Sequence, residues 1–411
     1  MVQKSIFRRA TPKQGHATPK AGHFSECRIK ETCQSCRFIN EPYDANLGLK
    51  FTDGVRHLRE QGVIDNTHIL EPVASPKQLE YRTHAKLAVR PGSGGDLYTI
   101  GLFQPRTHIP IDLSYCPLHA PNIGKVIRAL KPVLAQNQIS AFDEKSLKGD
   151  LRYLVIRSSH VTDELMVTFV MTRPLKEPIR RVVKELQAQG HKIAAAWLNV
   201  NNDPGNAIFG LEDIHCAEAQ KLRSSLCDLD LRISHKAFFQ INPWMAEILY
   251  TRVASIAGTA LNGQSAWDLY CGTGQLALLL GRSGFQVLGI EESKEAVQDA
   301  ELNALNNALD KKCTFLPGRF EDLFQNIPSW AQTPSVIVCN PSRRGIDENA
   351  RHFLGSALRK SKGTLVYVSC EVETLARDLQ TFQSHGLKVK QLEAFDMFPQ
   401  TEKVEWIAVI K

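Results

Sequence analysis

A cysteine at the end of a predicted strand is the residue in this sequence best placed to act as a nucleophile. The apolar run GTLVYVSC ends at Cys370, and the helix-forming stretch EVETLARDLQTF follows at once. The thiol would then lie at the carboxyl edge of a sheet and at a helix N-terminus, where the helix dipole favours a thiolate. An isolated cysteine is more often a buried structural residue, so the function of Cys370 depends on what surrounds it.

A glycine turn predicts the cofactor. The segment SAWDLYCGTGQLALLL indicates a buried strand ending at Tyr270, then a turn from Cys271 to Gly274, then an apolar helix. The next strand, in QVLGIEES, ends in Glu291, which is placed to accept hydrogen bonds from a ribose diol. The turn lacks the third glycine that a dinucleotide pyrophosphate requires, so the pattern favours S-adenosylmethionine over NAD.

Two further strands end in polar residues at the same predicted edge. SVIVCN ends at Asn340, and a following Asn-Pro places an amide at the mouth of the sheet, although the pair is also typical of a plain turn. After CTFLPG, the acids Glu321 and Asp322 could bind an adenine amino group or could simply be solvated.

A thiol next to a methyl donor indicates a particular reaction. Carbon 5 of uracil is a poor nucleophile, but thiolate addition at carbon 6 makes it able to attack a methylsulfonium. A base must then remove the carbon-5 proton, and Glu405 at the start of the last predicted strand is the candidate, with Glu402 and Glu393 as competitors. Methyl transfer to nitrogen or oxygen would need no covalent step.

These residues require a parallel sheet to bring them together. From residue 232 to residue 411, strands alternate with helices of ten or more residues, which predicts a Rossmann-like α/β catalytic domain. Residues 79–231 read mainly as strands and predict a mostly β domain for RNA recognition, with a hairpin formed by LRYLVIRSS and ELMVTFVMTR. Residues 26–78 predict a small cysteine-rich lobe, and residues 1–25 a disordered basic arm.

Composition limits the possible classes of protein. The chain has 411 residues and a net charge of +7, but five of these charges fall in the arm, so the remainder is only weakly basic. With 43% hydrophobic residues there is still no apolar run that could span a bilayer, which excludes a membrane protein. Ten cysteines without a secretory signal predict a reducing, cytoplasmic location.

The order of the motifs resembles that of the RNA (uracil-5-)-methyltransferases. The matching segments are SHKAFFQINPWMAEILY, DLYCGTG, NPSRRGI, YVSCEVETLARD and DMFPQTEKVE, and the likeness extends from Cys27 to Lys411. The resemblance implies that Cys370 is the nucleophile and Glu405 the general base. It also implies four positions that bind S-adenosylmethionine: Gln240, Tyr270, Glu291 and Asn340.

The same resemblance implies a role for the cluster of cysteines near the N-terminus. Cys27, Cys33 and Cys36 are close in sequence, and thiolates in this pattern suit zinc and iron–sulfur clusters equally. The resemblance implies a [4Fe-4S] cluster with Cys116 as the fourth ligand. The five other cysteines apart from Cys370 are predicted to be structural.

Within the family the sequence is most similar to the RumB-like enzymes, which modify the 747-type uridine of 23S ribosomal RNA. Its first cluster cysteine comes too early for the RNA-binding TRAM barrel that many relatives carry, so we expect no TRAM domain. The expected partner is single-stranded or loop RNA, and we expect no DNA and no membrane. Transfer RNA, another ribosomal uridine and a non-catalytic RNA-binding role remain alternatives.

Three positions depart from the pattern of the family. Ser342 replaces a proline, Glu371 replaces the asparagine that usually follows the nucleophile, and Lys403 replaces a histidine. A carboxylate next to Cys370 would raise the pKa of the thiol unless it points outward or pairs with a cation.

Overall fold

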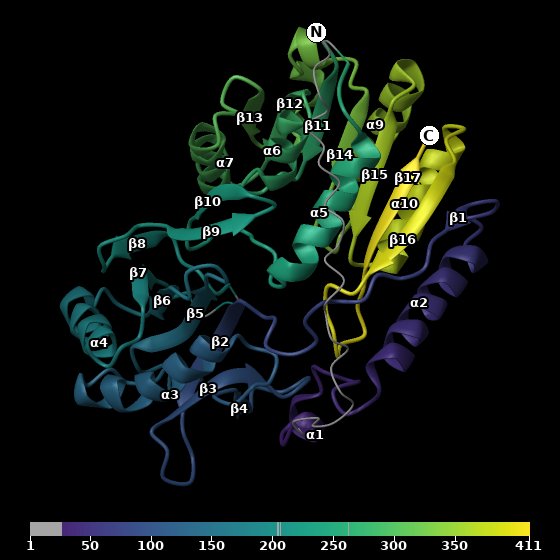
Figure 1. Cartoon of the computed structure of the whole chain (residues 1–411). Helices are drawn as coiled ribbons and strands as arrows, with labels where there is room; N and C mark the ends of the chain where they lie inside the picture. The colour runs from purple at the N-terminus through teal and green to yellow at the C-terminus, as the bar shows by residue number, and fades with distance from the viewer. Residues whose placement is uncertain (1–26, 204, 206, 262) are drawn as a thin grey trace, which may run out of the picture.

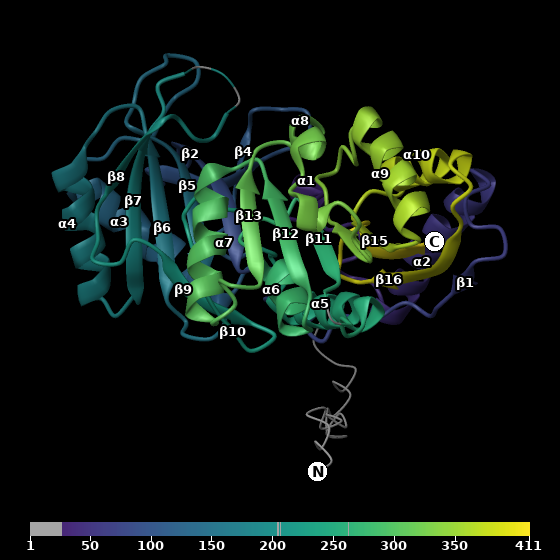
Figure 2. The same ribbon diagram turned by 90° about the horizontal axis from the view of Figure 1, so that it is seen from above.

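The computed structural model describes residues 27–203, 205, 207–261 and 263–411. The basic arm predicted for residues 1–25 lies outside these residues. Two sheets dominate the described part of the chain, one of eight strands and one of seven, and they lie side by side (Figure 1). Seen from above, the hairpin β9–β10 lies where the two sheets meet (Figure 2).

The eight-stranded sheet carries the residues predicted to do chemistry. Its strand order is β1-β16-β17-β15-β14-β11-β12-β13. Strands β11 to β15 pair in parallel, whereas β17 is antiparallel to both of its neighbours. The bounds are β1 His68–Ile69, β11 Ser265–Leu269, β12 Gln286–Glu291, β13 Cys313–Pro317, β14 Val336–Cys339, β15 Thr364–Ser369, β16 Val389–Phe395 and β17 Glu405–Ile410.

The strand order reverses direction at β11. The next strand, β12, lies on one side of β11, and β14 lies on the other. In open parallel sheets of this kind the chain leaves a crevice between the two strands at their carboxyl ends, and ligands bind there. The register pairs Leu269 with Cys339, so Tyr270 and Asn340 follow at neighbouring positions along this edge.

Helices cover both faces because buried side chains alternate along each central strand. In β15, Val366 and Val368 face one core while Leu365 and Tyr367 face the other. The first core includes α5 Pro243–Ala257, α6 Gln275–Arg282 and α7 Lys294–Asn306, and the second includes α9 Glu348–Ser361 and α10 Val372–Ser384, with the short α8 Phe320–Leu323 nearby. The predicted Rossmann-like α/β layering is confirmed.

Part of the predicted cysteine-rich lobe belongs instead to this sheet. Helix α2 (Tyr43–Glu60) buries Leu47 and Leu58 in the second core, and β1 pairs in parallel with β16. A Cβ atom on Gly54 would meet the Trp406 ring at 2.2 Å, so the helix and β17 approach very closely. Figure 1 shows α2 alongside α10 and β16. The expected lobe of residues 26–78 therefore reduces to the segment around α1 (Lys30–Cys33).

The seven-stranded sheet has the order β4-β3-β2-β5-β6-β7-β8. The predicted hairpin is confirmed, because β5 and β6 pair antiparallel. Helices α3 and α4 pack against the core of this sheet, and α4 coincides with the segment EPIRRVVKELQAQG, whose sequence is typical of a helix. The bounds are β2 His84–Pro91, β3 Tyr98–Phe103, β4 Pro110–Asp112, α3 Pro121–Gln136, β5 Leu151–Ser158, β6 Leu165–Met171, α4 Lys176–Ala188, β7 Ile193–Val200 and β8 Glu212–His215.

The hairpin β9–β10 crosses the boundary expected at residue 231. Its strands, Leu222–Leu226 and Leu229–Ile233, pair antiparallel. Leu226, Leu229 and Leu231 are buried in the first core of the eight-stranded sheet. The hairpin therefore packs with the catalytic part of the chain. None of the helices in the described residues has the length and apolar character needed to cross a membrane.

Candidate active site

A cavity of about 1130 Å³ opens at the carboxyl edge of the eight-stranded sheet. It collects residues from Phe238 to Glu405, which are 167 positions apart in sequence, because several strands end at the same edge. Its wall includes every residue that the sequence predicted for catalysis and for the cofactor: Gln240, Tyr270, Glu291, Asn340, Cys370 and Glu405.

The glycine turn between β11 and α6 has a backbone that only glycine adopts readily. Gly272 and Gly274 have φ angles of 54° and 88°. A Cβ atom on Gly274 would lie 2.9 Å from the Cβ of Ala300, so this position also has no room for a side chain. At Gly272 the nearest atom to such a Cβ would be the Phe238 carbonyl oxygen at 4.0 Å, which leaves open space above the turn.

Two carboxylates accept hydrogen bonds from backbone amides in the turn or close to it. The Asp268 carboxylate accepts a 2.7 Å hydrogen bond from the Ala277 amide, and burial raises the pKa of Asp268 to about 7. Glu291 accepts from the amides of Gly272 at 3.0 Å and Ser293 at 2.9 Å. Glu291 also lines the cavity, and a carboxylate with two oxygens can accept more hydrogen bonds than these two, as recognition of a diol requires.

The two acids predicted near an adenine ring separate in the structure. Glu321 lines the cavity and pairs with Arg319. Asp322 is not among the lining residues. Ser342, one of the departures from the family pattern, also lines the cavity, and its carbonyl accepts a 2.9 Å hydrogen bond from the Gly345 amide.

The nucleophile and base candidates face one another across neighbouring strands. The antiparallel register pairs Ser369 of β15 with Trp406 of β17, so the next pair outward is Cys370 and Glu405. Cys370 is half-buried, whereas Glu405 is only 3% exposed. Among the three candidate bases only Glu405 lines the cavity with Cys370: Glu393 pairs with Arg252 at 2.7 Å, and the exposed Glu402 pairs with Arg37 at 2.7 Å.

The protonation of this pair differs from what the helix dipole alone predicts. Burial, and next the Glu405 carboxylate, raise the pKa of Cys370 to about 11, while the Arg343 guanidinium acts in the opposite direction. Burial also raises the pKa of Glu405 to about 8, again opposed by Arg343. Both groups therefore hold their protons at neutral pH. Desolvation outweighs the dipole because the thiol is half-buried and burial is the largest influence on its pKa.

Two residues of the site carry no prediction from the sequence. Arg343 follows the Asn340–Pro341 turn and lines the cavity beside Cys370 and Glu405. Phe238 is 64% exposed although it is large and apolar, and it also lines the cavity. The only signals in the sequence were the pair of arginines in NPSRRGI and the aromatic pair in FFQ, and neither pattern is specific without the fold.

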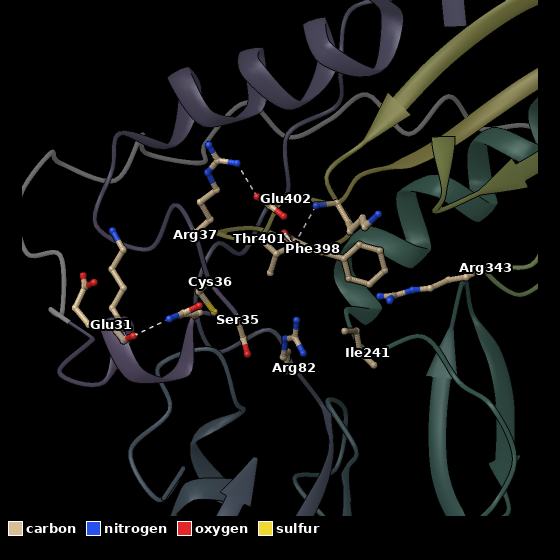
Figure 3. A pocket seen from close by; sticks show the side chains of 13 residues that line it. Glu31, Ser35, Cys36, Arg37, Arg82, Ile241, Arg343, Phe398, Thr401 and Glu402 are labelled. Carbon is tan, nitrogen blue, oxygen red and sulfur yellow. Dashed lines mark hydrogen bonds and ion pairs between the residues drawn. The ribbon is translucent and has the colours of Figure 1, made fainter. Parts of the chain in front are cut away.

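A second hollow, which we call the cationic groove, adjoins the first. It measures about 560 Å³ and shares Ile241, Arg343 and Phe398 with the active-site cavity. Figure 3 shows Arg82 and Arg343 directed into it from different walls. The Nε atom of Arg82 is buried without a hydrogen-bond partner. The lining residues are Lys30, Glu31, Gln34, Ser35, Cys36, Arg37, Arg82, Ile241, Arg343, Phe398, Thr401, Glu402 and Lys403.

The four cysteines predicted to bind metal come together only loosely. Cys27, Cys36 and Cys116 pack against one small cluster of Ile39, Tyr81 and Leu118. Cys33 packs with Cys116 against the core of the seven-stranded sheet. Within the described residues, however, no group of three or more histidine, cysteine or acidic side chains is arranged to hold a metal ion. The four thiols share one region, and the arrangement of the described side chains does not show the metal site predicted from the sequence.

The other cysteines behave as the sequence predicted for structural residues. All five are buried and carry free thiols: Cys216, Cys227, Cys271, Cys313 and Cys339.

A Rossmann-like sheet with a glycine turn, an acid after the second strand and an open cavity at its carboxyl edge defines the class of S-adenosylmethionine-dependent methyltransferases. The sequence profile of a methyltransferase domain matches residues 262–407. The profile of the tRNA (uracil-5-)-methyltransferase family matches residues 63–316. The chain belongs to this family and is an S-adenosylmethionine-dependent RNA methyltransferase, as the resemblance implied.

Individual relatives agree with this assignment. An uncharacterized RNA methyltransferase of Geobacter sulfurreducens is 33% identical over 96% of this chain and 78% of its own length. Another, from Clostridium acetobutylicum, is 30% identical over 94% of this chain and 83% of its own. A solved structure, the tRNA (uracil-54, C5)-methyltransferase of Pyrococcus abyssi in complex with S-adenosyl-L-homocysteine, is 25% identical with a TM-score of 0.74, covering 92% of this chain and 86% of that one.

Proposed function

We propose that this enzyme methylates carbon 5 of a uridine in RNA through a covalent adduct on Cys370. The observation that carries the proposal is the placement of Cys370 opposite Glu405 on neighbouring strand ends, within one cavity beside the glycine turn. A methyltransferase acting on nitrogen or oxygen needs no thiol at this place, whereas carbon 5 of uracil requires one.

The chain supplies the nucleophile and the base. Cys370 first loses its thiol proton to water, and the thiolate then forms a bond to carbon 6 of the uracil. The electron pair of the 5,6 double bond moves toward carbon 5, which can then accept a methyl group. S-adenosylmethionine, when bound, supplies that methyl group. The Glu405 carboxylate then takes the carbon-5 proton, the electrons of that C–H bond restore the double bond, and the thiolate leaves. Arg343 favours the ionised forms of both residues.

The four residues named from the sequence suit the cofactor. Glu291 would accept hydrogen bonds from the ribose hydroxyls, and the open space above Gly272 would admit the cofactor against the turn. Gln240, Tyr270 and Asn340 line the same cavity and would contact the remainder of the molecule. The Pyrococcus abyssi relative was solved with the product form of this cofactor, which supports the choice of ligand.

For the substrate we propose a 747-type uridine of 23S ribosomal RNA, supported by the RumB-like segments YRTHAKLAV and GDLRYLVIRSS. The second candidate is a transfer RNA uridine, favoured by the name of the family and by the Pyrococcus abyssi relative. The region around the seven-stranded sheet would supply RNA recognition in either case. A flipped base from a loop is the expected form, because unstacking costs least there.

The deciding experiment incubates the protein and S-adenosylmethionine with unmodified transcripts of 23S ribosomal RNA and of transfer RNA, and maps 5-methyluridine in both. Methylation at one ribosomal loop uridine is the expected result. Modification of transfer RNA alone would overturn the choice of substrate but keep the chemistry. Methylation of neither RNA, with RNA binding retained, would favour the non-catalytic alternative.

We propose that the RNA strand next to the target uridine runs through the cationic groove. Arg82 offers a buried donor without a partner, and Arg343 links the groove to the catalytic cavity. Replacing Arg82 with glutamine should weaken RNA binding severalfold and reduce the slope of log affinity against log salt by about 1, as loss of one phosphate contact does.

Fluorescence anisotropy across a series of salt concentrations measures both quantities. Arg180 on α4 serves as the control, since it is exposed, pairs with Glu177 at 3.1 Å and lies outside the groove. The Arg180→Gln variant should match the parent protein. An unchanged salt slope in Arg82→Gln would exclude Arg82 as a phosphate contact. Metal content is compared in parallel, because Arg82 lies near Cys36 and Cys116.

We also propose that Cys27, Cys33, Cys36 and Cys116 ligate a [4Fe-4S] cluster. The support is a set of four thiols in one region, three of them on a single small apolar cluster, together with the sequence resemblance. Such a cluster would hold the segment around α1 against the wall of the groove.

Protein purified without oxygen should contain about four irons and four sulfides per chain. The Cys116→Ser variant should lose them, while Cys216→Ser should keep them because Cys216 is a buried core residue. Stoichiometric zinc without sulfide would overturn the iron–sulfur assignment.

A further inference from the structure

Two of the positions that depart from the family pattern contact one another. Lys403 Nζ lies 2.6 Å from one carboxylate oxygen of Glu371 and 2.8 Å from the other, although the residues are 32 positions apart. Glu371 directly follows the nucleophile candidate, and Lys403 lies two residues before the base candidate. The ion pair therefore joins the two segments that carry the reacting groups.

The backbone around Glu371 leaves its side chain free for this contact. Glu371 is the N-cap of α10, but its side chain makes no capping hydrogen bond. The hydroxyl of Ser369 accepts from the Glu371 amide at 3.2 Å and donates to the Glu371 carbonyl at 3.1 Å. Asparagine, the usual family residue, is a good N-cap, whereas glutamate is not. The substitution thus exchanges a helix cap for a charge that reaches the opposite segment.

The segment carrying Lys403 has a rigid anchor of its own. The buried Lys50 of α2 pairs with Asp396 at 2.6 Å and also contacts the carbonyl oxygens of Phe398 and Lys403, each at 3.4 Å. Exposed ion pairs usually contribute little, because two mobile side chains must be ordered. Here the Glu371 side chain is only 18% exposed and the lysine backbone is already held.

We propose that Glu371 and Lys403 form a positioning pair, which holds Cys370 opposite Glu405 and neutralises the carboxylate next to the thiol. The catalytic part of this inference rests on the function proposed above. Glu371 lines neither hollow, whereas Lys403 also lines the cationic groove, so the positioning role is tested in the absence of RNA.

The charges around the thiol explain why neutralisation matters. Glu405 faces Cys370 from β17, Arg343 from the loop after β14, and Glu371 from the start of α10. Burial, and next the neighbouring Glu373, raise the pKa of Glu371, while Lys403 acts in the opposite direction. Without Lys403, the thiol would face the uncompensated charges of this acidic group with only Arg343 to oppose them.

The test measures the thiol directly, without RNA or cofactor. Iodoacetamide alkylation of Cys370 is followed by peptide mass spectrometry as a function of pH in the parent protein and in Lys403→Met, Glu371→Gln and the double variant. Lys403→Met should react about three to ten times more slowly at pH 8, since its thiol holds the proton to higher pH. Glu371→Gln should react faster than Lys403→Met, and the double variant should return close to the parent profile.

Lys403→Arg keeps the charge and should keep the parent profile, which separates a charge effect from local unfolding. The inference is wrong if Lys403→Met reacts like the parent, or if the double variant is as slow as Lys403→Met. Single-turnover methylation of RNA is then compared across the same variants. The alkylation rates of the variants can also differ as expected while the parent protein fails to methylate RNA. That outcome would contradict the proposed function but would still support the positioning pair.

Discussion

Replacing Cys370 with alanine should reduce methylation of RNA on the order of 10⁴-fold or more, and should abolish any covalent complex with RNA. Removal of a nucleophile commonly lowers the rate by this much, because the remaining groups cannot replace the covalent step. Here the loss should be close to complete, since carbon 5 of uracil has almost no nucleophilic character until carbon 6 is bonded to sulfur. Transfer of a radiolabelled methyl group to RNA measures the rate, and a denaturing gel detects the adduct.

A neighbouring cysteine provides the matched control for this prediction. Cys339 ends β14, next to β15, but its side chain is fully buried in the second core. Cys339→Ala should therefore keep both activity and adduct formation. Substantial turnover by Cys370→Ala, with normal cofactor binding, would show that the reaction does not proceed through this thiol.

Replacing Glu405 with glutamine should stop turnover after the methyl group has been transferred and make the RNA adduct accumulate. Glutamine keeps the size of the side chain but cannot accept the carbon-5 proton, so the thiolate cannot leave. We expect turnover to fall by about 10² to 10⁴-fold, the usual contribution of a general base. Above pH 8, where Glu405 is ionised, the same change also removes a negative charge beside Cys370, which lowers the pKa of the thiol and should speed adduct formation.

The pH profile gives a second measure of Glu405. Burial raises its pKa to about 8, so the carboxylate that must accept the proton becomes abundant only as the pH rises toward and beyond that value. Parent turnover should therefore increase from pH 6 to pH 9. Glu177→Gln is the control, because this exposed acid of α4 pairs with Arg180 at 3.1 Å and lines neither the catalytic cavity nor the cationic groove. Normal turnover by Glu405→Gln would exclude it as the base.

The sequence was sufficient to predict which residues gather at one edge of the sheet, because most of them follow strands. Tyr270, Asn340 and Cys370 each come directly after a buried apolar run, and parallel strands deliver their ends to one edge. Choosing Glu405 over Glu393 and Glu402 required the register of β15 and β17. That register depends on tertiary pairing, which no local pattern contains.

Other features depended on contacts between distant segments. Arg343 and Phe238 look like ordinary loop residues until the fold directs them into the cavity. The role of Glu371 could not be predicted either, because only the pairing of β15 with β17 brings its partner Lys403 next to it. The helix dipole suggested a thiolate at Cys370, but the depth of the site and the facing carboxylate, which dominate its pKa, could not be predicted from position alone.

The pairing of β1 with β16 also affects the order in which the protein can fold during synthesis. Helix α2 and β1 emerge early from the ribosome, yet their apolar residues are covered by β16, β17 and α10, which are made last. Domains usually fold as their own residues emerge, but this catalytic sheet cannot close until the end of the chain is free. Leu47, Val55 and Leu58 therefore stay exposed through most of translation, and contacts this distant in sequence slow folding. The nascent chain thus presents a surface for chaperones long before the enzyme can bind RNA.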